Sequence, residues 1–416
     1  MREKSLNLFF APSRKLAAHR LAHGGPRIYD PRERLVLAGA DALLRAVSLV
    51  SGLRPKRTLP DVRSVESVLA LRLDRLGDLV TTLPALELLR RALPQARLEL
   101  AVGSWNEPVA RRLPFIDRVR VVDAPWSAWG KKASFSAACV ALGRAPFDLA
   151  LDFQGDVRVI LLMALSGAKL RAGYGDTGGG YLLTHRARWD EKISWYEQNV
   201  SLVRALFPGI APSGPVRPYN FVTDEDRREA SLFLDESKRP LVGIHPSAGR
   251  ALKEWEPGKF AALADRLSEI ATVVLTGSET DRPLVERICE TTASRPAKVL
   301  GLDLATFAAF IERLDVFVTG DTGPMHLSHA VGTRNVAVFG PSDPIRYGPD
   351  ESLGLRRVVR SSVYCSPCNM IRKPPAECAK VPTPECLSTV ALDQVLLAVR
   401  EALNSASVPR GPTPAA

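Results

Sequence analysis

The sequence predicts an α/β fold in which two Rossmann-like, doubly wound parallel-sheet domains face a central cleft. Three observations support this prediction. The chain has 416 residues, more than one hydrophobic core usually organises. Short apolar runs of strand length alternate with segments of helical periodicity, as in parallel sheets covered by helices. The alternation stops at a stretch rich in proline and glycine and then restarts.

A basic extension, residues 1–63, precedes the first predicted strand. It holds 13 Lys and Arg against 5 Asp and Glu, and so carries +8 of the net charge of +11. Apolar residues recur at helical spacing over residues 35–53, interrupted by Asp41 and Arg45. We expect a helix that lies on anionic lipid. A helix docked on the protein itself and an unstructured basic arm remain alternatives.

The rest of the sequence narrows the classes of protein to consider. No run approaches the ~20 apolar residues that span a bilayer, and no small-residue cleavage site follows the late apolar stretch, so a signal peptide fits poorly. The basic segment lacks the interleaved aromatic residues of a nucleic-acid platform. These features argue against membrane insertion, export and a nucleic-acid partner.

The N-terminal domain is expected to span residues 64–207. The segment after its first strand reads as a helix that starts at Asp78, and Pro84 inside it predicts a separate or kinked first turn. The strand candidates are short and apolar, as in a sheet buried on both faces. They are residues 67–73, 97–102, 118–123, 148–152 and 169–174.

A linker is predicted at residues 208–222, and the C-terminal domain at residues 223–400, followed by a tail at 401–416. Its strand candidates are residues 241–245, 272–276, 297–301, 315–319 and 335–339. Open parallel sheets bind ligands at the carboxyl ends of their strands. Function is therefore expected in the loops after residues 73, 245, 276, 319 and 339.

The most informative stretch is Thr319-Gly-Asp-Thr-Gly-Pro-Met-His326, a glycine-rich turn between a strand and a helix. Gly320 and Gly323 allow a ligand to approach the backbone, and the free N–H groups and positive dipole end of the helix favour an anion. Thr322 and His326 add side-chain donors. The alternative is an ordinary turn in which Asp321 or Thr322 caps the helix.

Neighbouring loops of the same domain supply further candidates. After the strand that ends at His245, Ser247 lines a close backbone approach and Lys253 offers a mobile charge suited to phosphate. Thr276 and Gly277 end the next strand and are candidates for the nucleoside end of a ligand, with a capped turn as the alternative. In the first domain, the glycine-rich loop of residues 174–189 is a candidate acceptor loop.

The loop after the first strand presents carboxylates at a helix start. Asp78 is a candidate general base that takes a proton from a hydroxyl nucleophile, and N-capping is the alternative. Asp74 competes for either role. The dinucleotide fingerprint G-x-G-x-x-G is absent here, which argues against a nicotinamide enzyme.

Four of the six cysteines crowd into one proline-rich segment, residues 365–386. Cys365, Cys368, Cys378 and Cys386 have the spacing C-x2-C-x9-C-x7-C, which is typical of a tetrathiolate zinc or iron site. Such a site would be structural, because four thiolates leave no open coordination position. Reduced cysteines, or disulfides in an exported protein, remain alternatives.

Taken together, these motifs resemble glycosyltransferase family 9, the lipopolysaccharide heptosyltransferases, over roughly residues 67–400. The resemblance implies a GT-B fold, with the acceptor on the first domain, the nucleotide sugar on the second, and a final helix that crosses back. The matching motifs are Arg72-Leu-Asp-Arg-Leu-Gly-Asp78, Leu83-Pro-Ala85, His245-Pro-Ser-Ala-Gly249, Lys253-Glu-Trp255, Thr319-Gly-Asp-Thr-Gly-Pro-Met-His326 and Phe339-Gly-Pro-Ser-Asp-Pro344.

By this resemblance, Asp78 matches the acidic residue that acts as base on the acceptor hydroxyl, and Lys253 matches the lysine that meets the donor phosphates. Thr322, Gly323 and His326 match the diphosphate turn. The implied chemistry is inverting transfer of a heptose from ADP-heptose to a lipopolysaccharide core, without a catalytic metal or other cofactor. The implied location is cytoplasmic, peripheral on the inner face of the cytoplasmic membrane.

Two departures from the family pattern leave the acceptor open. Ser247 stands where many relatives have glycine, and the N-terminal extension is longer than usual. Another sugar, or another lipid-linked or protein acceptor, remains an alternative. So do a non-catalytic protein that binds nucleotide sugars and a different nucleotide-sugar enzyme such as an epimerase.

Overall fold

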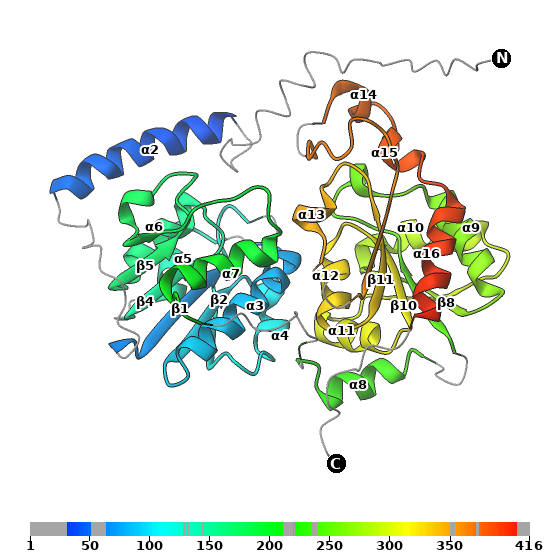
Figure 1. The fold of residues 1–416 in the computed structure, drawn as a ribbon, viewed down its shortest axis with the longest axis horizontal. Coiled ribbons are helices and arrows are strands. Elements are labelled where there is room, and N and C mark those ends of the chain that lie inside the picture. Colours follow the sequence, from blue (N-terminus) through cyan, green and yellow to red (C-terminus); the bar gives the residue numbers. More distant parts are fainter. Residues whose placement is uncertain are drawn as a thin grey trace, which may run out of the picture.

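The computed structural model consists of two six-stranded sheets flanked by helices (Figure 1). All strand pairs in both sheets are parallel. This confirms the predicted fold class of two Rossmann-like domains. The structure describes residues 31–50, 64–127, 130, 133–143, 145, 147–210, 219, 221–234, 239–349, 354–371 and 374–405.

The N-terminal sheet has the strand order β3-β2-β1-β4-β5-β6. Its central strands β1 and β4 are apolar and buried, which a sheet covered on both faces requires. Its strands are β1 (Ser67–Arg72), β2 (Arg97–Val102), β3 (Arg118–Val121), β4 (Leu149–Asp152), β5 (Leu170–Gly173) and β6 (His185–Arg186). Its helices are α3 (Leu76–Ala92), α4 (Glu107–Ala110), α5 (Phe135–Leu142), α6 (Val157–Leu165) and α7 (Trp195–Leu206), with the 3-10 turns η2 (Ser104–Asn106) and η3 (Gly180–Leu182).

The C-terminal sheet has the order β12-β11-β10-β7-β8-β9. Its strands are β7 (Leu241–His245), β8 (Thr272–Gly277), β9 (Ala297–Leu300), β10 (Val316–Gly320), β11 (Arg334–Phe339) and β12 (Arg356–Arg360). Its helices are α8 (Asp224–Ser231), α9 (Pro257–Ser268), α10 (Arg282–Thr291), α11 (Leu304–Glu312), α12 (Gly323–Ala330), α13 (Pro344–Tyr347), α14 (Ala376–Ala379), α15 (Glu385–Ser388) and α16 (Leu392–Asn404), with the turns η4 (Ala251–Lys253) and η5 (Glu279–Asp281).

Both sheets therefore repeat one topology, in which the fourth strand of each returns to pair with its first. The order reverses between β1 and β4 in one sheet and between β7 and β10 in the other. Loops that leave neighbouring strands at such a point diverge to opposite faces and open a crevice for ligands. The turn before α12 and the loop before α3 each leave a strand at one of these two points.

Helix α3 begins at Leu76, two residues before the predicted start at Asp78, and continues through Pro84, so the prediction of a separate first turn is wrong. An interior proline costs about 3 kcal/mol. Pro84 lies among buried residues such as Leu83 and Leu86, on a helix that packs against α7 and α12. Burial of this helix face offsets the lost hydrogen bond.

The ten predicted strands are all present, with ends that shift by one or two residues, and the sheets contain two further strands. Both additions, β6 and β12, lie at sheet edges. Strand β6 has only two residues, and β12 reads Arg-Arg-Val-Val-Arg. Neither is a continuous apolar run, because an edge strand is paired and covered on fewer sides. Apolar continuity, the signal used for prediction, is therefore weak at these positions.

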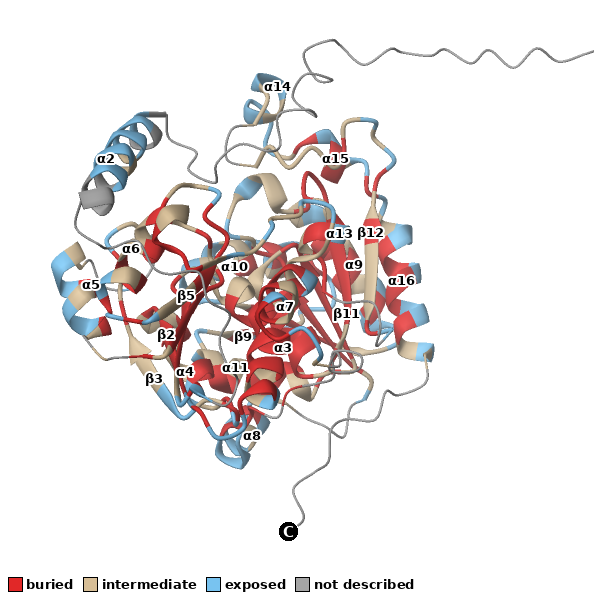
Figure 2. Cartoon of the chain, turned by 60° about the vertical axis from the view of Figure 1, so that its left-hand side comes forward, coloured by how far each residue is buried: buried red, intermediate tan, exposed pale blue. Residues whose placement is uncertain are grey.

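Apolar packing continues across the boundary between the two sheets (Figure 2). One cluster of buried residues combines Leu83 and Leu86 of α3 with Phe310 of α11 and Leu327 of α12. The last helix, α16, packs against α9, β10, β11 and β12 of its own sheet. Within the described residues, the return to the first domain that the resemblance implied is not among its main packing contacts. Most of the predicted linker and the tail beyond residue 405 lie outside the described residues.

Candidate active site

The first turns of α3 and α12 meet across the interface between the two domains (Figure 1). A Cβ added to Gly77 would lie 2.9 Å from Cδ2 of His326, and one added to Gly323 would lie 3.5 Å from Leu76. Glycine at position 77 is thus required for this close approach. The contact brings the loops after β1 and β10, from opposite domains, into one site.

The start of α12 has no side-chain cap. Thr322 is the N-cap residue, but its hydroxyl lies 3.2 Å from the Thr319 hydroxyl and does not bond the helix backbone. The Asp321 carboxylate is also engaged elsewhere, as described next. The turn was expected to be either an anion site or an ordinary capped turn. A side-chain cap is absent here, so the positive end of the helix dipole is available to an anion.

Lys253 and Asp321 form an ion pair with 2.6 Å between Nζ and Oδ2. Their side chains are only 15% and 8% exposed, and they come from the loops after β7 and β10, which flank the crossover of the C-terminal sheet. A Cβ on Gly320 would lie 3.1 Å from the Lys253 carbonyl oxygen, so glycine allows the two loops to approach. The pair holds the lysine ammonium beside the start of α12.

His326 is buried and contacts the first domain through Tyr196, whose hydroxyl lies 3.0 Å from Nδ1. Burial lowers the pKa of His326 to about 4, outweighing the opposite influence of Asp321 and Asp78. The ring is therefore neutral near pH 7. A neutral imidazole offers one hydrogen-bond donor and one acceptor.

Two further predicted residues, Thr276 and Ser247, contact His245 at the end of β7. The imidazole bonds the Thr276 hydroxyl through Nδ1 and the Ser247 hydroxyl through Nε2, each at 3.1 Å. Burial lowers the pKa of His245 to about 4. Ser247 is 5% exposed and Thr276 fully buried, so their hydroxyls orient this histidine. Gly277 packs closely on the next turn, since a Cβ there would lie 2.9 Å from Cβ of Asp281. Contact of these residues with a nucleotide stays a prediction.

Asp78 lies in the first turn of α3 with its side chain 30% exposed. One carboxylate oxygen accepts a hydrogen bond from the Arg75 amide at 3.2 Å, and the other lies 3.5 Å from a guanidinium nitrogen of Arg72. Asp78 thus takes part in capping, the alternative to catalysis, and still presents a partly exposed carboxylate. Asp74, the competitor, lies 3.1 Å from the same guanidinium.

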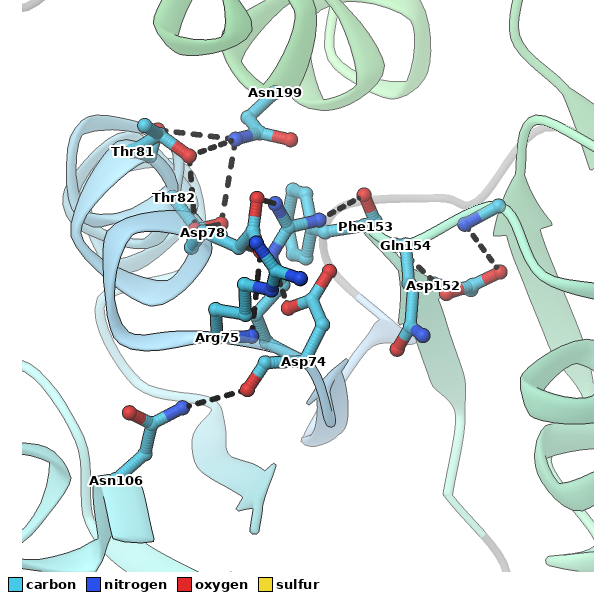
Figure 3. A network of polar contacts seen from close by, with 12 residues as sticks. Asp74, Arg75, Asp78, Thr81, Thr82, Asn106, Asp152, Phe153, Gln154 and Asn199 are labelled. Carbon is cyan, nitrogen blue, oxygen red and sulfur yellow. Dashed lines mark hydrogen bonds and ion pairs between the residues drawn. The ribbon is translucent and has the colours of Figure 1, made fainter. Parts of the chain in front are cut away.

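A polar network holds this loop in place (Figure 3). The Asn199 amide donates to the Thr81 carbonyl at 3.0 Å, and the Thr81 and Thr82 hydroxyls donate to the Asp78 carbonyl at 2.8 Å. On the other side, Asn106 donates to the Asp74 carbonyl at 3.1 Å. The start of α3 is therefore tied to α7 and to η2, which fixes the backbone from which the Asp78 side chain projects.

Sequence reasoning assigned no role to Arg72, the last residue of β1. It is fully buried, donates to the carbonyls of Asp78 and Phe153, and lies 5.6 Å from the Trp195 ring. The signal available in the sequence was an arginine at the end of an otherwise apolar strand. Its positive charge sits directly beside Asp78.

Arg346 of α13 was also missed, although it joins the two domains. Its guanidinium lies 4.4 Å from the Trp189 ring and 4.6 Å from the Trp195 ring, and it donates to the carbonyls of Asp190 and Ile193. Burial lowers the pKa of Arg346. Two aromatic faces and two carbonyls thus offset the desolvation of one charge. No spacing in the sequence signals this contact.

The predicted acceptor loop begins and ends in the same aromatic cluster. Tyr174 is buried and its ring meets Trp189 edge-on at 5.3 Å, while Trp189 meets Trp195 at 4.9 Å. Between these anchors, Gly178 and Gly179 have φ of 123° and 73°, which side-chain-bearing residues rarely adopt. The loop is thus anchored at both ends close to α7.

The four clustered cysteines line one pocket of about 100 Å³ together with Leu252 of η4. Burial and the neighbouring thiols raise the pKa of Cys386 to about 12. Among the described residues, however, no three His, Cys, Asp or Glu side chains are placed to hold a metal ion. The predicted residues are thus gathered, but their arrangement is not a ligand set for zinc or iron.

Comparisons with known proteins agree with this architecture. The family model "Glycosyltransferase family 9 (heptosyltransferase)" matches residues 137–377. Lipopolysaccharide heptosyltransferase 1 of Pseudomonas aeruginosa is 27% identical over 316 residues, covering 72% of this chain and 85% of its own.

Two solved structures are similar over most of their length. A family 9 glycosyl transferase from Veillonella parvula has a TM-score of 0.69 at 24% identity, covering 81% of this chain and 97% of its own. The E. coli ADP-heptose LPS heptosyltransferase II has a TM-score of 0.65 at 20% identity, covering 81% of this chain and 98% of its own.

Proposed function

Because this chain belongs to glycosyltransferase family 9 and has its GT-B fold, we propose that it transfers a heptose or related sugar from ADP-heptose to a lipopolysaccharide core or other lipid-linked acceptor, with inversion at the anomeric carbon. The names of the relatives from P. aeruginosa and E. coli support this donor and this class of acceptor. The site of action would be the cytoplasmic face of the cytoplasmic membrane.

The observation that carries the proposal is that an anion-binding group and a proton-accepting group lie on either side of the contact between α3 and α12. The C-terminal domain contributes an uncapped helix start and the Lys253 ammonium, both of which attract a diphosphate. The N-terminal domain contributes a partly exposed carboxylate, Asp78. A group that stabilises a leaving anion and a group that accepts a proton thus lie on opposite sides of one interface.

In the proposed reaction, Asp78 accepts the proton of an acceptor hydroxyl as that oxygen attacks the anomeric carbon of the donor. The bond between the anomeric carbon and the diphosphate oxygen breaks, and the nucleoside diphosphate leaves with the electron pair. One direct displacement inverts the configuration. The N–H groups of α12 and Lys253 stabilise the departing negative charge, as preorganised donors do at a developing anion.

The contacts of the site suggest a supporting role for two of the predicted residues. Asp321 pairs with Lys253, and we assign to it the positioning of the ammonium beside the helix start. His326 is neutral near pH 7 and can donate one hydrogen bond to a phosphate oxygen without adding charge. The proposed charge stabilisation uses protein groups, so transfer should persist in excess EDTA.

The cysteine pocket takes no part in these steps. The gathering of four thiols supports a structural role for zinc or iron, and such a role requires that they move into a tetrahedral arrangement. Metal analysis of anaerobically purified protein tests this. Less than about one zinc or iron per chain, with four freely titratable thiols, would exclude it.

A thermal-shift panel of ADP-, UDP- and GDP-sugars, followed by a transfer assay, tests the proposed function. A true donor raises the melting temperature by mass action. ADP-heptose should stabilise the protein and should be consumed only when an acceptor is present. Stabilisation without transfer to any core or lipid-linked acceptor would indicate a non-catalytic binding protein, and consumption without acceptor would indicate an epimerase-like enzyme.

A further inference from the structure

Helix α2 (Pro31–Val50) lies against the N-terminal domain through a polar contact (Figure 1). The Asp41 carboxylate accepts a hydrogen bond from the Gly179 amide at 2.8 Å, and the Asp41 carbonyl accepts one from the Tyr181 hydroxyl at 3.2 Å. A Cβ on Gly178 would lie 3.1 Å from the same carboxylate. The single acidic side chain described on this helix therefore faces the protein.

The opposite face of α2 is apolar and exposed to solvent (Figure 2). Leu35, Val36 and Leu43 are 77%, 70% and 67% exposed. At 100° per residue, these three lie within one third of the helix circumference, together with the exposed Arg32, Gly39 and Ala46, and Asp41 lies on the far side. A surface helix of a globular protein normally buries its apolar stripe and exposes its polar one. Here the orientation is reversed.

The positive charge of α2 and of its flanking segments indicates that its exposed face fits a negatively charged surface. The described arginines of the helix, Arg32 and Arg45, are exposed, and residues 1–63 carry +8 of the chain's +11. Arg32 lies on the same third of the helix, about one turn before Leu35, and Arg45 lies nearer to Asp41. Leucine and valine exposed together with arginine are typical of a helix that lies in the headgroup region of an anionic bilayer. No helix within the described residues has the length and apolarity to cross a membrane.

The position of α2 on the molecule also supports an anionic bilayer as its partner. The residues that hold α2, Gly179 and Tyr181, belong to the glycine-rich loop predicted to meet the acceptor. Helix α2 also stands at the same end of the molecule as α14 in both views (Figures 1 and 2). Near α14, Tyr364 and Val381 are 65% and 44% exposed, and Lys380 is exposed as well.

We propose that the outward face of α2, formed by Leu35, Val36 and Leu43, docks on an anionic lipid bilayer and holds the predicted acceptor loop, residues 174–189, at the membrane surface. The idea that docking brings the loop close to a membrane-anchored acceptor rests on the proposed function. The docking itself does not, since it depends only on the exposed face and its charge.

Flotation with vesicles tests the docking directly. The full chain is mixed with vesicles of equal parts phosphatidylethanolamine and phosphatidylglycerol, or of phosphatidylcholine alone, and the bound fraction is measured. The wild type should float with the anionic vesicles more than with the neutral ones. Leu35→Glu/Leu43→Glu should lower the partition coefficient at least about tenfold, because each apolar side chain would be replaced by a charge at the lipid boundary.

The matched control is Leu232→Glu/Leu397→Glu, which makes the same change in charge at leucines 81% and 58% exposed, one directly after the end of α8 and the other on α16. This variant should float like the wild type. Circular dichroism and melting temperature establish that both variants fold, as substitutions at exposed positions allow. Transfer to a water-soluble acceptor analogue, measured separately, should be equal in all three proteins, so failure of the enzyme assay leaves the flotation result intact.

Equal flotation of the wild type and Leu35→Glu/Leu43→Glu would overturn the proposal. So would equal loss in both double variants, since general charge would then explain binding. A wild type that does not float, but sediments as a dimer that Leu35→Glu/Leu43→Glu separates, would show that the face binds a second copy of the chain.

Discussion

Among the individual residues of the site, Asp78 and Asp74 have similar surroundings but different proposed roles. Both carboxylates lie near the Arg72 guanidinium, at 3.5 Å and 3.1 Å. Only Asp78 lies within the first turn of α3, where that helix meets α12. The roles of base and structural partner can therefore be separated by making the same substitution at both positions.

Asp78→Asn should lower kcat by roughly a hundredfold to ten-thousandfold, the range for loss of a general base, and leave donor affinity unchanged. The amide still accepts the Arg75 hydrogen bond, so the helix start is preserved. Steady-state kinetics and donor titration check this. Asp74→Asn is the matched control and should retain most activity, whereas the reverse pattern would move the base to Asp74.

Lys253→Ala should weaken the binding of ADP-heptose by about tenfold or more, because a hydrogen bond to a charged group contributes roughly 1.5–3 kcal/mol. Calorimetric titration with the donor measures the dissociation constant. Lys298→Ala removes the same charge from an exposed position on the same sheet and should bind like the wild type. Equal affinity in both variants would contradict a phosphate contact of Lys253.

The two buried histidines predict a pH dependence of stability. Burial holds the pKa of His245 and of His326 at about 4, below the usual 6.5, so the unfolded chain binds more protons between these values. Their contribution to stability is present above pH 6.5 and is lost as the pH falls toward 4. Each should lower the free energy of unfolding by about 2 kcal/mol between pH 7 and pH 5.

Urea denaturation at both pH values measures this loss. In His326→Asn, the fall in the free energy of unfolding from pH 7 to pH 5 should be smaller than in the wild type by about that amount. A fall of the same size would show that His326 is already protonated, or accessible to solvent, in the folded protein.

At the scale of elements, the contact between α3 and α12 determines the distance between the proposed base and the proposed anion site. This contact depends on the missing side chain at Gly77. The helices themselves are held independently, α3 by α7 and α12 by β10, β11 and α11. A small group inserted between them should therefore change their spacing without unfolding either domain.

Gly77→Ala should lower kcat about tenfold or more, because the added Cβ would lie 2.9 Å from His326 and displace the two helix starts, and misplacement by about 1 Å can cost a hundredfold in rate. The melting temperature should change little. Gly258→Ala, in α9 with no atom within 4 Å of the added Cβ, is the control. Wild-type kinetics in Gly77→Ala would indicate that the helix contact has no influence on transfer.

For the whole molecule, Arg346 is one of the side chains that join the two domains. It is 6% exposed between Trp189 and Trp195 of the first domain, while its own helix belongs to the second. A second link is the bidentate pair of Arg112 with Asp226, at 2.9 and 2.7 Å. Together with the shared apolar cluster, these contacts hold the two sheets in one arrangement.

Arg346→Ala should loosen the domain interface, since two aromatic rings and two carbonyls lose their partner. We expect faster hydrogen exchange at residues 187–195 and a lower melting temperature, consistent with the cost of breaking a buried charged contact. Arg400→Ala, at an exposed position on α16, should leave both quantities unchanged. Unchanged exchange in Arg346→Ala would show that the domains are held without this residue.

Much of this architecture could be predicted from local sequence. The ten apolar strands, the glycine turn before α12 and the positions of Asp78 and Lys253 at strand ends follow from hydrophobic periodicity and turn chemistry, which depend on neighbouring residues. Periodicity did not reveal the edge strands β6 and β12, nor the continuity of α3 through Pro84. In those cases pairing and burial against distant segments outweighed local preference.

By itself, the sequence determined the fold class, the strand ends at which the proposed site lies and the residue types proposed to bind a diphosphate and accept a proton. Only the tertiary structure decided how these groups are paired: Lys253 with Asp321, Asp78 with Arg72, and Arg346 between two tryptophans. It also decided that α2 turns its apolar face outward. The reason is physical, because such pairings join residues far apart in the chain, and no local periodicity constrains which distant side chains meet.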